Sequence, residues 1–290
     1  MTFRFPLGCG VLLTATFLVA DVLSAQTRRP NIVIIVADDL GYADLGCQGA
    51  KDIKTPNIDG IANHGVRCAN GYAAAPVGGP TRAALLTGRY PQRFGFEFNP
   101  PRDPKSEYGL PTTETTLANS LTTAGYTTCL VGKWHLGNDP QRHPQARGFK
   151  DFFGFLDGAH YYLDSEAPAR GVLPTASPWP NGILRGTEPV VEKDYLTDAF
   201  TREAVAFIDK HQKQPFFLLI SYSAPHAPLE ASDKYLNRVI GVTGGDHRRR
   251  VYSATIAALD DGVGAIQAKL KATGVLEDTL IFFLSDNGGI

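Results

Sequence analysis

The chain has 290 residues, 43% of them hydrophobic, and its 28 basic and 29 acidic residues leave a formal net charge of −1. That length and apolar content are enough for one large domain with a buried core. The balanced charge gives no support to nucleic-acid binding or to a general role at a membrane surface.

The first 25 residues have the pattern of a secretory signal peptide. Arg4 provides a short positive start, residues 11–20 form a nearly continuous apolar run, and residues 23–25 (Leu-Ser-Ala) offer a small-residue cleavage site. The apolar run is short for a membrane span, although an uncleaved N-terminal anchor is the alternative interpretation. We therefore expect a secreted or periplasmic protein with no stable membrane span once residues 1–25 are removed.

Four apolar runs have the length and the β-branched or aromatic content of buried parallel strands. Three segments between them have helical periodicity. Strands that alternate with helices predict an α/β fold with a doubly wound, mainly parallel sheet. In chain order, the predicted elements are a strand at Asn31–Ala37, a helix at Thr115–Thr123, a strand at Tyr126–Val131, a helix at Tyr195–His211, a strand at Phe216–Ser221, a helix at Val251–Ala272 and a strand at Thr279–Leu284.

A further short helix is predicted after the first strand. Pro80 suits the first helical position, the run from Arg82 to Leu86 consists of good helix formers, and Gly88 is a stop signal. Unpaired N–H groups at the start of this helix would favour an anion.

Polar residues follow each of the four predicted strands at once. Because ligands of open α/β sheets bind outside the carboxyl ends of the strands, we expect these side chains to meet at one edge of the sheet. They are Asp38 and Asp39 after the first strand, Lys133 and His135 after the second, His226 after the third, and Asp286 and Asn287 after the fourth.

The residue types in this set indicate a cation next to an anion. Carboxylate and amide oxygens are hard ligands that suit Ca²⁺ or Mg²⁺ and are unattractive to Zn²⁺. Lys133, His135, His226 and the helical Arg82 supply positive charge and hydrogen-bond donors for an anion with several oxygens. Hydrolysis of a sulfate or phosphate ester requires such a combination.

Each of these residue types also has an ordinary structural interpretation. An Asp-Asp pair is usually a solvated turn, and an Asp-Asn-Gly run is usually an Asx turn. Asp260-Asp261 lies inside a helical pattern and is assigned no metal, and residues 247–250 (His-Arg-Arg-Arg) are interpreted as a solvated loop and helix start. Lys133 could be a surface charge, whereas the Pro-rich loop around His226 favours a functional role.

Six motifs, in the same order along the chain, resemble those of the sulfatase family in the alkaline-phosphatase-like superfamily. The resemblance covers the N-terminal catalytic portion of that family. The motifs are residues 30–42 (PNIVIIVADDLGY), 78–88 (GGPTRAALLTG), 132–137 (GKWHLG), 148–154 (GFKDFFG), 224–228 (APHAP) and 284–289 (LSDNGG).

The resemblance implies hydrolysis of aryl or carbohydrate sulfates, so that the partner is a sulfated small molecule or glycan. It also implies a metal ion, Ca²⁺ in preference to Mg²⁺. The implied ligands of this ion are Asp38, Asp39, Asp286 and Asn287.

The family's catalytic roles map onto further residues of this sequence. Arg82 would support the position at which the family carries formylglycine. Lys133 and His226 would contact the sulfate oxygens, and His135 would stabilise the hydrated aldehyde or relay a proton there.

The chain departs from the family at the residue on which catalysis depends. In the family, the Cys or Ser at the start of the second motif is oxidised to formylglycine, and here that position is Gly78. Glycine has no side chain to oxidise, so a covalent mechanism lacks its nucleophile. Gly79 replaces a small polar neighbour, and Thr81 stands for Ser.

The sequence also stops at Ile290, directly after the last motif, whereas family members continue. We therefore expect residues 26–290 to be a truncated N-terminal catalytic domain without the C-terminal subdomain. An unfinished sheet would expose an edge and apolar faces. Part of the substrate specificity would come from loops such as residues 156–190.

Three hypotheses follow from this combination. The first is an impaired or inactive sulfatase relative that binds a divalent cation and a sulfated ligand. The second is a working hydrolase, of phosphodiesterase type for example, that uses metal-bound hydroxide or Thr81; Thr81 lies about one helical turn away and would direct its hydroxyl elsewhere. The third is a non-functional gene fragment.

Three cysteines remain outside the predicted signal peptide. Their odd number leaves at least one thiol unpaired, and no pair has metal-site spacing. We expect small buried apolar side chains, with room for at most one disulfide among Cys47, Cys68 and Cys129.

Overall fold

The computed structural model describes residues 29–101, 103, 106–163, 182–241 and 245–289. The predicted signal peptide lies outside the described residues, as do residues 164–181 of the predicted specificity loop.

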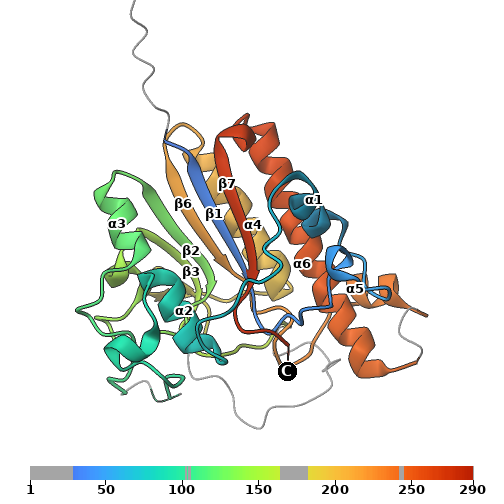
Figure 1. Cartoon of the computed structure of the whole chain (residues 1–290), viewed down its shortest axis with the longest axis horizontal. Helices are drawn as coiled ribbons and strands as arrows, with labels where there is room; N and C mark the ends of the chain where they lie inside the picture. The colour runs from blue at the N-terminus through green and yellow to red at the C-terminus, as the bar shows by residue number, and fades with distance from the viewer. Residues whose placement is uncertain (1–28, 102, 104–105, 164–181, 242–244, 290) are drawn as a thin grey trace, which may run out of the picture.

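Seven strands form one sheet in the described part of the chain, in the order β5-β4-β3-β2-β6-β1-β7 (Figure 1). The pairings β3-β2, β2-β6, β6-β1 and β1-β7 are parallel. The pairings β3-β4 and β4-β5, at one edge of the sheet, are antiparallel. The predicted α/β class with a mainly parallel sheet is confirmed. The strands are β1 (Asn31–Ala37), β2 (Thr127–Lys133), β3 (Asp151–Phe155), β4 (Leu184–Arg185), β5 (Glu188–Pro189), β6 (Phe216–Ser221) and β7 (Thr279–Ser285).

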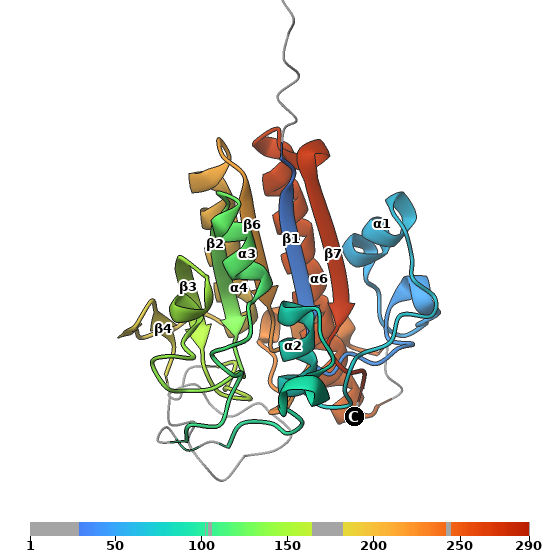
Figure 2. The ribbon, with the colours of Figure 1, turned by 60° about the vertical axis from the view of Figure 1, so that its left-hand side comes forward.

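Helices cover both faces of the sheet, which explains why the central strands read as continuous apolar runs. On one face, α4 and α6 pack on the sheet and α1 packs against α6; on the other face lie α2 and α3 (Figures 1 and 2). Alternate residues of β1 point to opposite faces, with Ile35 in the first core and Ile34 in the second. The α-helices are α1 (Pro56–His64), α2 (Gly78–Thr87), α3 (Leu117–Thr123), α4 (Leu196–His211), α5 (Asp233–Leu236) and α6 (His247–Ala272).

Short 3-10 turns connect several of these elements. They are η1 (Gly46–Gln48), η2 (Pro91–Phe94), η3 (Pro144–Arg147), η4 (Asn237–Val239) and η5 (Leu276–Asp278).

The structure places every predicted strand and helix within a few residues of its expected bounds and adds elements that were not predicted. These are β3, β4, β5, α1 and α5. Helix α2 begins at Gly78, so the expected start at Pro80 was wrong by two residues. A proline is tolerated there because the first N–H groups of a helix have no intrahelical partner. The basic run 247–250 forms the first turn of α6, which Asp246 caps.

Strand β7 is an edge of the sheet in the described chain. Leu280 and Phe282 on one face of it are 50% and 51% exposed, whereas Leu284 packs into the core on that face. No helix in the described residues has the length and apolar character that a membrane span needs.

The three cysteines are free thiols. Cys129 is buried, as predicted, and its burial raises the pKa of its thiol well above the ordinary value. Cys68 is exposed and Cys47 is partly exposed, so the expectation of burial was wrong for these two. Cys47 lies beside α1, where its N–H donates to Asp59 Oδ1 (2.7 Å), and it packs against the core on that side of the sheet.

Asp260 joins α6 to α1 through a buried carboxylate. Its Oδ1 accepts hydrogen bonds from the backbone N–H groups of Asn57 (3.1 Å) and Ile58 (2.8 Å), and its Oδ2 accepts one from Asn57 Nδ2 (2.8 Å). The N-terminus of α1 has no side-chain cap of its own, so this distant carboxylate does the capping. Asp260 therefore has a structural role.

We expect Asp260→Ala to lower the free energy of unfolding by about 2–4 kcal/mol, because it removes a cap and leaves buried N–H donors without a partner. Urea unfolding monitored by circular dichroism measures this loss. The control is Asp261→Ala, which removes a partly exposed partner of Arg238 and should cost less than about 1 kcal/mol. Equal losses in the two variants would contradict the capping role.

Candidate active site

The loops that follow β1 and β7 bring three acidic side chains together at the carboxyl edge of the sheet. The N–H of Asp286 donates to Ala37 O (3.0 Å), and the N–H of Asp39 donates to Asp286 Oδ1 (3.1 Å). One carboxylate oxygen each of Asp38, Asp39 and Asp286 lies within 4.8 Å of the others, and all three residues are buried. The parallel pairing of β1 with β7 is what places these loops side by side.

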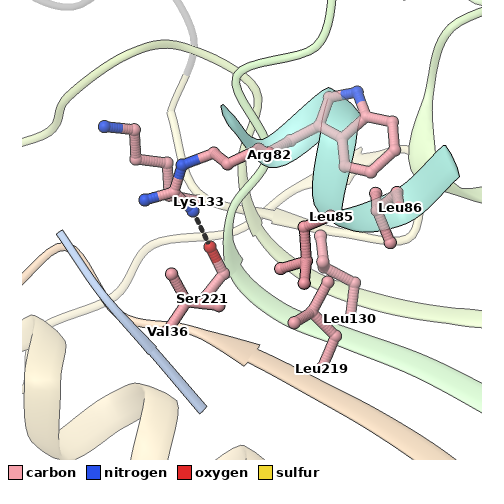
Figure 3. Close-up of a pocket in the computed structure, with 9 residues that line it drawn as sticks. Val36, Arg82, Leu85, Leu86, Leu130, Lys133, Leu219 and Ser221 are labelled. Carbon is pink, nitrogen blue, oxygen red and sulfur yellow. Dashed lines mark hydrogen bonds between the residues drawn. The ribbon is translucent and has the colours of Figure 1, made fainter. Parts of the chain in front are cut away.

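Arg82 points from α2 into this acidic group. Its Nη2 donates to Asp38 Oδ1 and to Asp286 Oδ2, both at 3.0 Å, and its Nη1 donates to Ser221 Oγ at the end of β6 (Figure 3). The guanidinium thereby ties one helix to the ends of three strands. The contacts with the two carboxylates are charge-assisted hydrogen bonds. Only 4% of Arg82 is exposed, so they lie in an environment with little water.

Lys133, the last residue of β2, adds a second buried cation. Its Nζ lies 2.5 Å from Asp38 Oδ2, and the Arg82 guanidinium contacts the other oxygen of the same carboxylate. Burial disfavours the charged carboxylate of Asp38, but the charges of Lys133 and Arg82 outweigh it, so the pKa of Asp38 lies below its ordinary value. Burial lowers the pKa of Lys133 and raises that of Asp286.

Asp39, His226 and Asn287 form the other side of the site. Asn287 Nδ2 lies 2.6 Å from Asp39 Oδ1, and His226 Nε2 lies 3.5 Å from Asp39 Oδ2. Asp39 adopts a left-handed backbone with φ of 60°, which non-glycine residues rarely do. Residues held in such conformations cluster at functional sites.

Gly78, the first residue of α2, faces this group of side chains. A Cβ atom built on Gly78 would lie 3.1 Å from Asp286 Oδ2, 3.5 Å from His135 Nδ1 and 3.6 Å from Asn287 Oδ1. A side chain at position 78 would therefore start at the acidic group and point into it. The structure thus brings together all nine site residues predicted from the sequence.

The start of α2 offers an anion fewer donors than the sequence suggested. The N–H of Gly79 donates to Asn99 Oδ1 (2.9 Å), Pro80 has no N–H, and the N–H of Thr81 donates to Val77 O (3.2 Å). An anion at this site would thus depend mainly on cationic side chains. The Thr81 hydroxyl donates to Ala75 O (2.7 Å), so it is already engaged with the backbone.

Several residues that shape the site were not predicted. Ser221 holds Arg82, Asn99 caps α2, and the Tyr162 hydroxyl lies 2.6 Å from Ser223 O and 2.9 Å from His226 O in the loop that carries His226. For Ser221 a signal existed, since it is a polar residue at the last position of an apolar strand. Asn99 and Tyr162 lie on irregular segments, and no sequence pattern connects them to the site.

The donor set fits a hard divalent cation. Three buried carboxylates and the amide of Asn287 present only oxygen acceptors of the type that Ca²⁺ and Mg²⁺ prefer, and no thiolate takes part. A cation between them would offset the charge that Arg82 and Lys133 leave uncompensated, because three carboxylates face two cationic side chains.

Comparison with known proteins shows the family to which the chain belongs. The profile of the family described as Sulfatase matches residues 30–290. The chain is 38% identical to the N-acetylgalactosamine-6-sulfatase of Mus musculus in an alignment of 274 residues that covers 90% of this chain and 51% of that protein. The chain belongs to the sulfatase family.

Other members of the sulfatase family match over the same region. Arylsulfatase A of Homo sapiens is 34% identical over 285 residues, covering 91% of this chain and 53% of that protein. The crystal structure of Ps i-CgsB has a TM-score of 0.82 at 43% identity and covers 90% of this chain and 59% of that chain. This sulfatase-family chain spans about half the length of the curated relatives it matches.

We expect Lys133→Met to lower the free energy of unfolding by about 3 kcal/mol, because it leaves Asp38 buried with one cation fewer. Chemical denaturation in the absence of divalent cations measures the loss. As a control, Lys234→Met removes an exposed ion pair with Asp198 and should cost less than about 1 kcal/mol. An unchanged stability of Lys133→Met would contradict the importance of this buried contact.

Proposed function

We propose that this chain is a sulfatase scaffold that binds a divalent cation and the sulfate group of a sulfated ligand, and that its sulfate-ester hydrolysis is impaired because Gly78 has replaced the nucleophile. The observation that carries the proposal is the direction in which a side chain at position 78 would point. A Cβ there would lie 3.1 Å from a carboxylate oxygen of Asp286 and 3.5 Å from His135 Nδ1, so this position is the one from which a side chain could attack.

Asp38, Asp39, Asp286 and Asn287 would hold the cation, which we propose to be Ca²⁺ rather than Mg²⁺. Several side-chain oxygens converge here, which suits Ca²⁺, whereas Mg²⁺ usually keeps several waters and takes only one or two carboxylates. When bound, the cation would polarise a sulfate oxygen.

The cationic side chains would bind and orient the anion. Lys133 and His226 lie on either side of the acidic group, next to Asp38 and Asp39 respectively, where they could contact sulfate oxygens. Arg82 would keep the carboxylates in place, since its acidic partners Asp38 and Asp286 both belong to the proposed ligand set. His135 would hold or move a proton at the atom attached to position 78.

The names of the relatives support a sulfated carbohydrate or an aryl sulfate as the ligand class. They include an N-acetylgalactosamine-6-sulfatase and an arylsulfatase, and Ps i-CgsB has been crystallised with k-i-k-neocarrahexaose. The N-terminal signal pattern supports an exported protein, and we propose that the mature chain acts outside the cytoplasm on such compounds.

The first test is hydrolysis of a chromogenic aryl sulfate by the chain and by Gly78→Cys co-expressed with a formylglycine-generating system. Loss of a catalytic nucleophile can cost about 10⁶-fold in kcat, so we expect Gly78→Cys to exceed the parent by at least about 10³-fold in kcat/KM.

The matched control is Gly78→Ala, which adds the same Cβ without an oxidisable atom and should stay inactive. Activity of the unaltered chain equal to that of Gly78→Cys would contradict impairment, and would indicate that water itself is the nucleophile. A folded but silent Gly78→Cys would contradict the view that one residue disables the site.

The cation site is tested by thermal unfolding with and without Ca²⁺. At a Ca²⁺ concentration 100 times the Kd, the stability should rise by about 2.7 kcal/mol, which raises the Tm by several degrees. Asp39→Asn should remove most of this shift, whereas the control Asp261→Asn should keep it. No shift in the unaltered chain would contradict the proposed metal site.

A further inference from the structure

His135 is held in an unusual backbone conformation beside β3. Its φ is 61°, and together with Asp39 it is one of two non-glycine residues with positive φ in the described chain. The parallel pairing of β2 with β3 continues past both strands, because the N–H groups of Trp134 and His135 donate to Phe155 O and Leu156 O, each at 3.0 Å. This register brings Gly158, two residues after Leu156, next to the His135 side chain.

Two glycines face the His135 ring. A Cβ on Gly158 would lie 2.7 Å from Nε2, 3.0 Å from Cε1 and 3.3 Å from Cδ2, whereas a Cβ on Gly78 would lie 3.5 Å from Nδ1. The 2.7 Å distance is shorter than real Cβ contacts, the distances of 3.0 and 3.3 Å are tight, and that of 3.5 Å is an ordinary van der Waals contact. The buried ring can therefore occupy its place only because residue 158 has no side chain.

We propose that Gly158 is a positioning residue for His135, because the lack of a side chain at 158 lets the ring lie against that residue, with position 78 facing Nδ1. The catalytic part of this inference rests on the proposed function, but the contact itself does not. A side chain at 158 would push the ring away from β3 and toward position 78.

The absence of a Cβ at position 78 then has a second effect besides the loss of a nucleophile. It removes an atom that would lie 3.5 Å from Nδ1, so no side chain at position 78 opposes a displacement of the ring in that direction. A substitution at Gly158 should be better tolerated here than in a chain that carries a side chain at position 78.

A double-mutant cycle tests this coupling without requiring activity. Gly158→Ala and Gly78→Ala are made singly and together, and their melting temperatures are compared. We expect the double variant to melt at least about 2 °C below the sum of the single effects, because the displaced ring then meets the new methyl group. The control Gly182→Ala adds a Cβ with no atom within 4 Å and should be additive with Gly78→Ala.

Ring NMR signals and kinetics complete the test. We expect Gly158→Ala to shift the His135 imidazole resonances, assigned with His135→Gln, while those of the exposed His64 stay unchanged. The kinetic test uses the Gly78→Cys variant after its cysteine has been converted to formylglycine. Adding Gly158→Ala to it should lower kcat by about 10²-fold with little change in KM, because displacing a catalytic group by about 1 Å can cost that much.

Additive melting temperatures with unmoved His135 resonances would overturn the positioning role. If Gly78→Cys has no activity, the proposed function fails, whereas the melting cycle and the resonances still decide the role of Gly158.

Discussion

The buried contact of Asp38 with Arg82 and Lys133 is the interaction on which the site depends. It joins the end of β1, the first turns of α2 and the end of β2, three segments that are far apart in the sequence. A buried ion pair contributes little net stability, but removing one member is costly, so the contact fixes geometry more than it stabilises the fold. Asp286 and Ser221 extend it to β7 and β6. Four neighbouring strands, β2, β6, β1 and β7, therefore end in one connected group of polar side chains.

The sheet topology and this polar group require each other. Parallel pairing aligns the strand ends, and apolar layers on both faces keep the edge dry enough for charges to act strongly. In this setting position 78 is the point where a helix start meets the acidic loops. Two separate facts meet here: the chain belongs to the sulfatase family, and position 78, which faces the acidic group, has no side chain.

The sequence was sufficient for the parts of this arrangement that follow from local pattern. Apolar runs such as Asn31–Ala37 predict buried strands, and a polar residue directly after each run predicts where the side chains meet. The sequence could not predict contacts between irregular segments. Asn99 and Gly158 reach the site through tertiary packing, and no hydrophobic periodicity indicates which residues such packing brings together. Strand β3 was missed although its Phe-rich segment had been recognised as a motif, since five residues with a central glycine give a weak strand signal.

The left-handed backbone of Asp39 has a consequence for how this chain could change over time. Such a conformation costs a non-glycine residue about 1–2 kcal/mol, and asparagine or glycine adopts it more readily. An active enzyme must retain the carboxylate in spite of that cost. Under the proposed function the carboxylate is also needed to bind the cation, so mutations at position 39 that relax the backbone would gain stability only with a loss of metal binding.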